Sequence, residues 1–294
     1  MVHNICVLSV TRDDFFTIVA VFTEKPMPEL PEVETTLRGL EPWLVGGHIA
    51  SVTVRQPALR WPVTENLDQL VSGQLIVSLT RRAKYLQIQL ERGSLLIHLG
   101  MSGSLRIVDA NSAWRKHDHI ELRTTQDRCL RYHDPRRFGS CQWSLDEHWQ
   151  LKNLGPEPLS SEFHGDLLYR QSRGRKVAIK PFIMNAAVVV GVGNIYAAEA
   201  LFLSGIRPDR SAGRVSRVRY DRLATNIKGV LARAISQGGT TLRDFVDSKG
   251  EPGYFQQQLN VYGRQGQPCL NCSLALREQR LGQRSSVYCV SCQT

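Results

Sequence analysis

Residues 27–34 read Met-Pro-Glu-Leu-Pro-Glu-Val-Glu, and they lead into a segment of helical periodicity, residues 33–45. If Met27 is the initiator and is removed, Pro28 becomes a free secondary amine beside Glu29. An α-amine has a pKa near 8, so more of it is neutral at pH 7 than of a lysine. Its attack on a sugar C1′ or an aldehyde gives an iminium, a fixed cation that draws electrons during elimination. The stretch therefore predicts covalent amine catalysis, although Pro and Glu can also simply start a helix.

The position of Pro28 inside the chain bears on that prediction. As numbered, its nitrogen is an amide without a lone pair to offer. We therefore expect the active protein to begin at Pro28, with residues 1–26 removed or never translated. Residues 15–22 are apolar, but Asp13 and Asp14 precede them and no small-residue cleavage site follows. This is a poor signal peptide, and no run reaches the roughly 18 apolar residues of a membrane span.

Charge is distributed unevenly over the 294 residues, whose net charge is +10. Residues 151–294 hold 20 Lys and Arg against 10 Asp and Glu, so this half carries the whole excess. Such a balance indicates a polyanionic partner, and a merely soluble basic protein is the alternative. The scattered cysteines Cys6, Cys129 and Cys141 suit reduced thiols in a cytosol.

Hydrophobic periodicity divides the chain into a strand-rich and a helix-rich half. The β-rich half contains short segments, many of them alternating apolar and polar residues, that are separated by short turns. They predict strands typical of a β-sandwich or flattened barrel at residues 50–55, 75–80, 84–90, 94–99, 103–108, 117–123, 128–133 and 138–144. Leu154-Gly-Pro-Glu-Pro-Leu159 is typical of a linker. Helices are then predicted at 161–171, 176–187, 194–204 and 215–236, followed by a Gly- and Pro-rich loop at 238–253 and a short metal-bound hairpin.

Four cysteines near the C-terminus have the strongest spacing signal, Cys269-x2-Cys272 and Cys289-x2-Cys292, with sixteen residues between the two pairs. Each turn presents two thiolates to one tetrahedral Zn²⁺, so we expect one structural zinc. Two disulfides are the alternative, which a chain without an export signal does not favour. Basic residues between the pairs point to a nucleic-acid finger: Arg277, Arg280 and Arg284.

A glycine-rich turn, Val189-Val-Gly-Val-Gly-Asn-Ile-Tyr196, lies between two predicted helices. Glycines allow backbone to approach a phosphate, and the helix that follows offers free N–H groups and a positive dipole end. Asn194 adds an amide there, with Arg175, Lys176 and Lys180 upstream. We therefore expect a phosphate clamp, although half of such turns are only turns.

Two tight loops in the β-rich half carry side chains suited to a distorted duplex. They are His98-Leu-Gly-Met-Ser-Gly103 and Asp134-Pro-Arg-Arg-Phe-Gly139, while Arg81-Arg-Ala-Lys84 lies at the start of a strand. An exposed Met beside an Arg and a Phe can wedge into DNA where a base has been pushed out. The alternatives are core packing for Met101 and Phe138 and a solvated turn for the arginines.

Together these residues resemble the bacterial formamidopyrimidine-DNA glycosylase family (8-oxoguanine DNA glycosylase/AP lyase), from Met27 to the C-terminus. The resemblance implies an α+β fold with a β-sandwich domain (27–153), a helix-two-turns-helix domain (160–262) and a zinc finger (263–294). It also implies a monomeric, cytoplasmic enzyme of base excision repair that acts on damaged double-stranded DNA, with no membrane partner. Oxidised purines would be removed and the strand nicked by β,δ-elimination.

The same resemblance implies roles for individual residues. Pro28 would be the Schiff-base nucleophile, Glu29 the acid/base, Lys84 the proton donor for β-elimination and Arg284 the corresponding residue for δ-elimination. Met101, Arg136 and Phe138 would fill the hole left by the flipped base. DNA phosphates would be held by His117, Arg175 or Lys176, Asn194 and Arg284. The loop Gly238–Tyr254 would cover the flipped base.

Two readings stay open beside this one. The sibling endonuclease VIII family acts on oxidised pyrimidines and shares the amine, the turn and the finger. The Glu-Leu-Pro-Glu start and the Met101, Arg136 and Phe138 set favour the purine enzyme. The second is a non-catalytic zinc-containing DNA-binding protein in which Pro28 stays blocked. Asn185 and Ala187 depart from the family pattern, which bears on helix contacts and not on chemistry.

Overall fold

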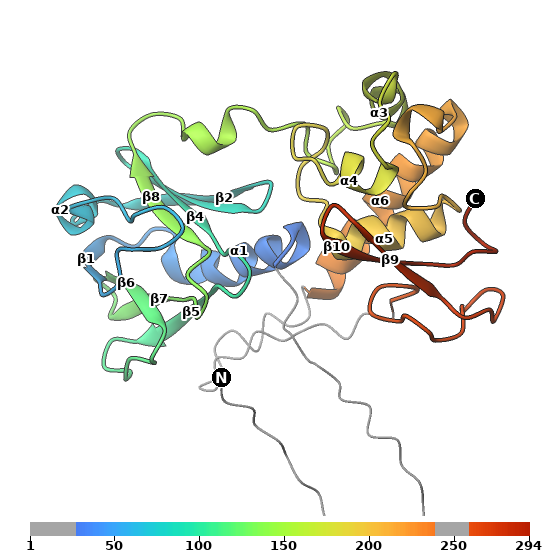
Figure 1. The fold of residues 1–294 in the computed structure, drawn as a ribbon. Coiled ribbons are helices and arrows are strands. Elements are labelled where there is room, and N and C mark those ends of the chain that lie inside the picture. Colours follow the sequence, from blue (N-terminus) through green and yellow to red (C-terminus); the bar gives the residue numbers. More distant parts are fainter. Residues whose placement is uncertain (1–27, 239–258) are drawn as a thin grey trace, which may run out of the picture.

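The computed structural model describes residues 28–238 and 259–294. Two lobes lie side by side in Figure 1, a β-rich lobe on the left and a helical lobe with a C-terminal hairpin on the right. The first helix, α1 (Leu30–Leu44), lies between them. Within the described ranges, no helix is long and apolar enough to cross a membrane.

The β-rich lobe is a sandwich of two antiparallel four-stranded sheets, ordered β1-β6-β7-β5 and β2-β3-β4-β8. Their inward side chains form one buried core of Val, Leu and Ile from both sheets. All eight predicted strands are present with small shifts at their ends. Their bounds are β1 (Ile49–Val54), β2 (Ile76–Arg82), β3 (Tyr85–Leu90), β4 (Ser94–His98), β5 (Ser104–Asp109), β6 (Asp118–Thr124), β7 (Arg128–His133) and β8 (Ser140–Ser144).

Helix α1 serves both lobes. It starts three residues earlier than the periodicity predicted, because Pro31 suits a first turn and the amide of Glu29 donates to Glu32 Oε2 at 2.9 Å. Its Val33, Leu37, Leu40 and Leu44 face the sandwich core. Its other side meets the long helix of the second lobe so closely that a Cβ on Gly238 would lie 2.4 Å from Thr35 Oγ1.

The helical lobe packs four helices around a second core. The helices are α3 (Gly165–Ser172), α4 (Ile179–Ile183), α5 (Asn194–Leu203) and α6 (Arg217–Gly238), with the 3₁₀ turn η2 (Ala212–Arg214). The predicted helix at 176–187 is wrong in length. Ala187 N donates to Asn185 Oδ1 at 3.0 Å, and this local side-chain bond replaces the next helical turn.

Short elements escaped the sequence analysis. Helix α2 (Leu67–Val71) and the 3₁₀ turn η1 (Trp149–Leu151) have five and three residues, too few to show a period. The predicted loop at 238–253 lies outside the described residues, apart from Gly238, which ends α6.

The C-terminal hairpin pairs β9 (Arg277–Leu281) with β10 (Arg284–Tyr288) and packs on α5. A third small core joins Ala198 and Phe202 of α5 to Leu276 and Val287. Glu199 of the same helix accepts hydrogen bonds from the amides of Asn260, Val261 and Tyr262 at 2.9–3.0 Å. The segment that enters the hairpin is thus held to the helical lobe.

Candidate active site and nucleic-acid interface

Glu29 lies where the two lobes meet, directly after the half-buried Pro28. Its side chain is buried, and its Oε1 accepts a hydrogen bond from the amide of Ile195 at 3.0 Å. Its Oε2 has no hydrogen-bond partner among the described residues. Burial raises the pKa of this carboxyl, against the opposing charge of Lys84. A protonated carboxyl with one free oxygen is suited to donate a proton.

The glycine-rich turn makes room for that carboxyl. A Cβ on Gly193 would lie 2.1 Å from Cδ of Glu29, and one on Gly191, where φ is +76°, would lie 2.4 Å from Leu30 Cδ1. The glycines therefore serve a close approach between the two lobes, which the sequence analysis did not foresee. Asn194 begins α5 and its Oδ1 has no hydrogen-bond partner among the described residues, so its phosphate role stays a prediction.

Lys84 lies in the turn between β2 and β3, after Ala83, whose φ of +56° is in the left-handed region. Its charge acts on two groups of the site. It opposes the rise in the pKa of Glu29, and together with burial and Arg60 it lowers the pKa of His98 to about 4. The structure therefore brings Lys84 and Glu29 into one electrostatic environment.

The two predicted wedge loops, residues 98–103 and 134–139, are locked together by the buried carboxylate of Asp134. Ser102 Oγ donates to Asp134 Oδ1 at 2.6 Å and accepts from the amide of Arg136 at 3.1 Å. Gly139 N and the Tyr132 hydroxyl donate to Asp134 Oδ2 at 2.9 and 3.2 Å. The loops thus form one rigid unit.

Three side chains of that unit, Met101, Arg136 and Phe138, are the predicted wedge. The guanidinium of Arg136 lies 5.0 Å from the ring centre of Phe138, which is 43% exposed, and Met101 is half-buried. Core packing is therefore excluded for Phe138. Gly100 sits against Phe138 so closely that a Cβ would lie 2.5 Å from the Phe138 carbonyl carbon.

The predicted phosphate ligands are spread over both lobes. Arg175 and Lys176 are exposed between α3 and α4, and Arg284 is exposed at the start of β10. His117 is half-buried, with its ring 5.8 Å from that of His133 and 6.3 Å from that of His119.

Lys180 departs from the expectation of a surface cation. It is buried, and its Nζ donates to Ser285 O at 2.7 Å and to Ser286 Oγ at 2.8 Å. Burial, together with the nearby charge of Arg284, lowers the pKa of Lys180 to about 8, while Glu29 opposes this shift. Lys180 therefore ties α4 to the hairpin beside Arg284 and within electrostatic reach of Glu29.

The four cysteines gather at the base of the hairpin. Their sulfur atoms all lie within 4.8 Å of one another, with 3.8 Å between Cys269 and Cys292 and 3.4 Å between Cys272 and Cys289. They are free thiols. Four thiolates at 2.3 Å from a tetrahedral ion are about 3.8 Å apart, so the cluster can bind a metal ion.

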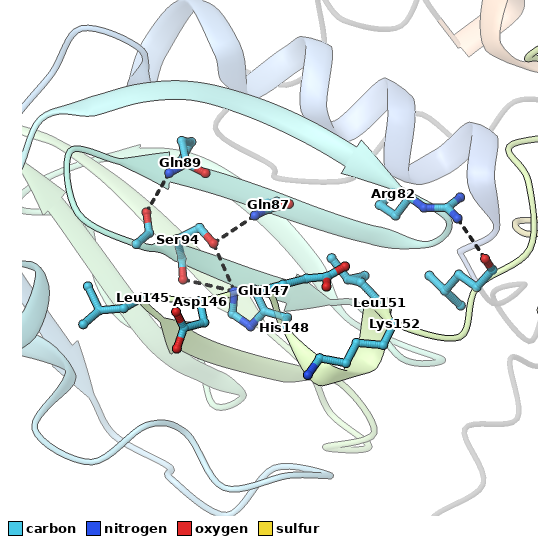
Figure 2. A pocket seen from close by; sticks show the side chains of 12 residues that line it. Arg82, Gln87, Gln89, Ser94, Leu145, Asp146, Glu147, His148, Leu151 and Lys152 are labelled. Carbon is cyan, nitrogen blue, oxygen red and sulfur yellow. Dashed lines mark hydrogen bonds between the residues drawn. The ribbon is translucent and has the colours of Figure 1, made fainter.

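A polar cavity of about 620 Å³ lies on the outer face of β3 and β4, under residues 145–154 (Figure 2). His148 Nε2 is 3.1 Å from Ser94 Oγ, and Gln87 Nε2 donates to the same hydroxyl at 2.9 Å. None of the predicted site residues lines this cavity. Because it lies apart from Glu29 and Lys84, which do not line it, we assign it no catalytic role.

Known proteins share this architecture over nearly the whole chain. The model of the formamidopyrimidine-DNA glycosylase N-terminal domain matches residues 27–141, and that of the H2TH domain of the same family matches residues 154–246. The formamidopyrimidine-DNA glycosylase of Stutzerimonas stutzeri (strain A1501) is 60% identical over 269 residues, 91% of this chain and 100% of that protein.

Solved structures agree with these matches. A complex of Lactococcus lactis Fpg with DNA containing an abasic site has a TM-score of 0.82 and 30% identity, and covers 91% of this chain and 100% of that one. MutM in complex with DNA containing carbocyclic 8-oxo-G has a TM-score of 0.82, 32% identity and the same coverage. On this extent of sequence and structural similarity, the chain belongs to the formamidopyrimidine-DNA glycosylase family.

Proposed function

We propose that this chain is a base excision repair DNA glycosylase and AP lyase that removes oxidised purines and nicks the strand by β,δ-elimination. Its substrates are 8-oxoguanine and formamidopyrimidines in double-stranded DNA, and it acts as a monomer. The observation that carries the proposal is Glu29, a buried carboxyl with raised pKa and one free oxygen beside Pro28. Relatives of known structure bind DNA with an abasic site or carbocyclic 8-oxo-G.

Pro28 supplies the nucleophile once its nitrogen is a free amine. That nitrogen bonds to C1′ of the flipped nucleotide, and the bond from C1′ to the base breaks. The base leaves with the bonding pair and gains the proton that the nitrogen loses, and the sugar ring then opens to an iminium as its ring oxygen is protonated. A protonated Glu29 can give its proton to the opening sugar, which its raised pKa favours. We infer that the active protein therefore begins at Pro28.

Lys84 and Arg284 serve the two strand-cleaving steps. Loss of a proton from C2′ expels the 3′ phosphate, and a second elimination expels the 5′ phosphate, both drawn by the iminium. The charge of Lys84 acts on Glu29, and the charge of Arg284 acts on Lys180, which is also influenced by Glu29. The two cations thus approach the site from opposite lobes.

DNA is held by basic and polar side chains of both lobes and opened by the wedge. His117, Arg175, Lys176, Asn194 and Arg284 are proposed to contact phosphates, which fix the bent duplex on both lobes. Met101, Arg136 and Phe138 take the place of the base that has been pushed out. Their locked loops support this role, because a preformed wedge loses little entropy when it inserts.

The cysteine cluster is proposed to hold one structural zinc. Its four sulfur donors leave no open position for water, which is the pattern of structural and not of catalytic zinc. When bound, the ion cross-links both ends of the hairpin that presents Arg284.

The proposal is tested by measuring base excision with residues 28–294 and a panel of duplexes in single turnover. We expect release from 8-oxoguanine and formamidopyrimidine sites and little from thymine glycol. Faster action on thymine glycol would favour the endonuclease VIII-like alternative. Binding without strand cleavage would favour the non-catalytic alternative.

A further inference from the structure

We propose that Glu157 is a positioning residue that holds Lys84 at a fixed position relative to Glu29, across the junction of the two lobes. The inference rests on the proposed role of Lys84. It concerns the segment Leu154–Leu159, which the sequence predicted to be a linker. In the structure this segment is bonded to both halves of the site.

The carboxylate of Glu157 grips the turn that carries Lys84. Its Oε2 accepts from Arg81 Nη1 at 2.8 Å, and its Oε1 accepts from Arg82 Nη1 at 2.9 Å and from the amide of Ala83 at 2.7 Å. Both oxygens are thus engaged, and the carboxylate is 23% exposed. The hydrogen bond from the amide involves Ala83, the residue directly before Lys84.

Other contacts of the two arginines complete the attachment. Arg82 Nη2 donates to Leu154 O at 3.2 Å and to Gly155 O at 2.6 Å. Arg81 Nε donates to Glu34 Oε2 of α1 at 2.8 Å. Turn, linker segment and first helix are therefore joined through charged groups.

The backbone of Ala83 has a conformation that needs support from its surroundings. Ala83 is buried at a φ of +56°, a conformation that alanine disfavours. A strained backbone conformation of this kind is kept only when surrounding contacts stabilise it. Glu157 provides such a contact by accepting a hydrogen bond from the amide of Ala83. The direction in which Lys84 leaves the turn follows from that conformation.

The opposite edge of the segment holds the glycine-rich turn. Gly155 N donates to Ala186 O at 2.7 Å, and Val190 N donates to Pro156 O at 3.2 Å. Val190 is followed by Gly191 and Gly193, the residues packed against Leu30 and Glu29. The segment thus lies between the turn of Lys84 and the turn that seats Glu29.

Charge strengthens the arrangement on the Lys84 side. Burial alone would raise the pKa of Glu157, but the Ala83 amide, Arg81 and Arg82 outweigh it and lower the pKa below its usual value. The carboxylate is therefore charged at neutral pH. Glu157→Gln keeps the shape and one acceptor but removes the charge that both guanidiniums face. We expect the turn to shift, and a displacement of about 1 Å can cost about 100-fold in rate.

A double-mutant cycle tests the inference. Single-turnover rates of 8-oxoguanine excision and of strand cleavage at a preformed abasic site are measured for four proteins spanning residues 28–294: wild type, Glu157→Gln, Lys84→Ala and the double variant. We expect Glu157→Gln to slow the step that Lys84→Ala slows, by about tenfold or more. In the Lys84→Ala background, Glu157→Gln should lower the rate by less than about twofold. Without the lysine side chain, a shift of the turn has no lysine to displace.

Controls separate positioning from general damage. Glu162→Gln, an exposed carboxylate five residues along, should leave both rates unchanged. The Tm and the salt dependence of DNA binding should be equal for Glu157→Gln and wild type. If Glu157→Gln does not fold, Arg82→Lys, which keeps the charge and loses contacts to Leu154 and Gly155, enters the same cycle.

Equal slowing by Glu157→Gln in both backgrounds, or no slowing at all, would overturn the positioning role while leaving the proposed function intact. A wild-type protein that neither excises 8-oxoguanine nor cleaves an abasic site would overturn the proposed function, and the positioning role with it.

Discussion

The amide of Ile195 donates to Oε1 of Glu29 at 3.0 Å, across 166 positions of sequence. This one bond joins the start of the first helix to the start of α5 in the other lobe. It gives the carboxyl one partner and leaves Oε2 without a hydrogen bond among the described residues. The environment of the Glu29 carboxyl therefore depends on how the two lobes are held together.

Glu29→Gln should separate stability from activity. Because the folded-state pKa of Glu29 is raised above 4.5, its stabilising contribution is present below pH 4.5 and is lost as the pH rises through the folded pKa. Glutamine cannot ionise, so the Tm of the variant minus that of wild type should increase with pH above 4.5. Excision should fall by about 10²- to 10⁴-fold, as for loss of a general acid. A Tm difference that does not change between pH 5 and 9 would contradict the assignment.

Ser102→Ala should make the two wedge loops more mobile without changing the reaction proposed for Pro28. The hydroxyl bonds both Asp134 and the amide of Arg136, and alanine makes neither bond. We expect 8-oxoguanine excision to slow by about tenfold, while cleavage at a preformed abasic site stays within about twofold. Ser102→Thr should restore most of the rate, and Ser112→Ala should have no effect. Equal loss at both substrates would show that Ser102 has a different role.

Phosphate and wedge residues should differ in their salt dependence. Each phosphate contact contributes about 0.9 to the slope of log affinity against log salt. Arg284→Ala or Lys176→Ala should reduce that slope, whereas Met101→Ala should leave it nearly unchanged and slow capture of the damaged base. Affinity titrations at four salt concentrations measure both quantities. A change in slope for Met101→Ala as large as that for Arg284→Ala would refute this division.

Loss of zinc should cripple DNA binding and leave the β-rich lobe folded. The four cysteines belong to the hairpin, whose small core is separate from the sandwich core. Structural zinc often supplies the folding free energy of so small a module. Bound zinc, DNA affinity and the thermal transition of Cys289→Ser are the measurements. Unchanged zinc content together with unchanged affinity would refute both the metal and its role.

Much of this architecture was predictable because its causes are local. Apolar runs, many of them alternating, marked all eight strands of the sandwich, and the Cys-x2-Cys spacing marked a cluster whose sulfur atoms lie within 4.8 Å of one another. Helix α4 was overestimated because the bond from Ala187 N to Asn185 Oδ1 competes with helical bonding, and periodicity does not register it.

Features with distant causes were missed. The glycine-rich turn was interpreted as a phosphate clamp, which stays a prediction, but its second function could not be foreseen: the missing side chain of Gly193 makes room for Glu29, a residue far away in sequence. Glu157 lay in a Pro- and Gly-rich segment typical of a linker, yet its carboxylate binds the amide of Ala83, 74 positions away. Lys180 was grouped with the basic residues upstream of the glycine-rich turn, and it is buried with its Nζ bonded to Ser286 Oγ. The local sequence pattern around each of these residues does not show which distant residue it will contact.

The central claim is that Pro28 is the nucleophile and must be the free N-terminus. Forms spanning residues 1–294 and 28–294, with each N-terminus confirmed by mass, are compared for strand cleavage and for borohydride trapping on DNA with an 8-oxoguanine site. We predict that the 28–294 form cleaves and is trapped covalently, while an unprocessed 1–294 form does neither, because an amide nitrogen cannot form an iminium. Equal cleavage and trapping by the unprocessed 1–294 chain would contradict the claim and transfer the role to a lysine, with Lys84 the first to test.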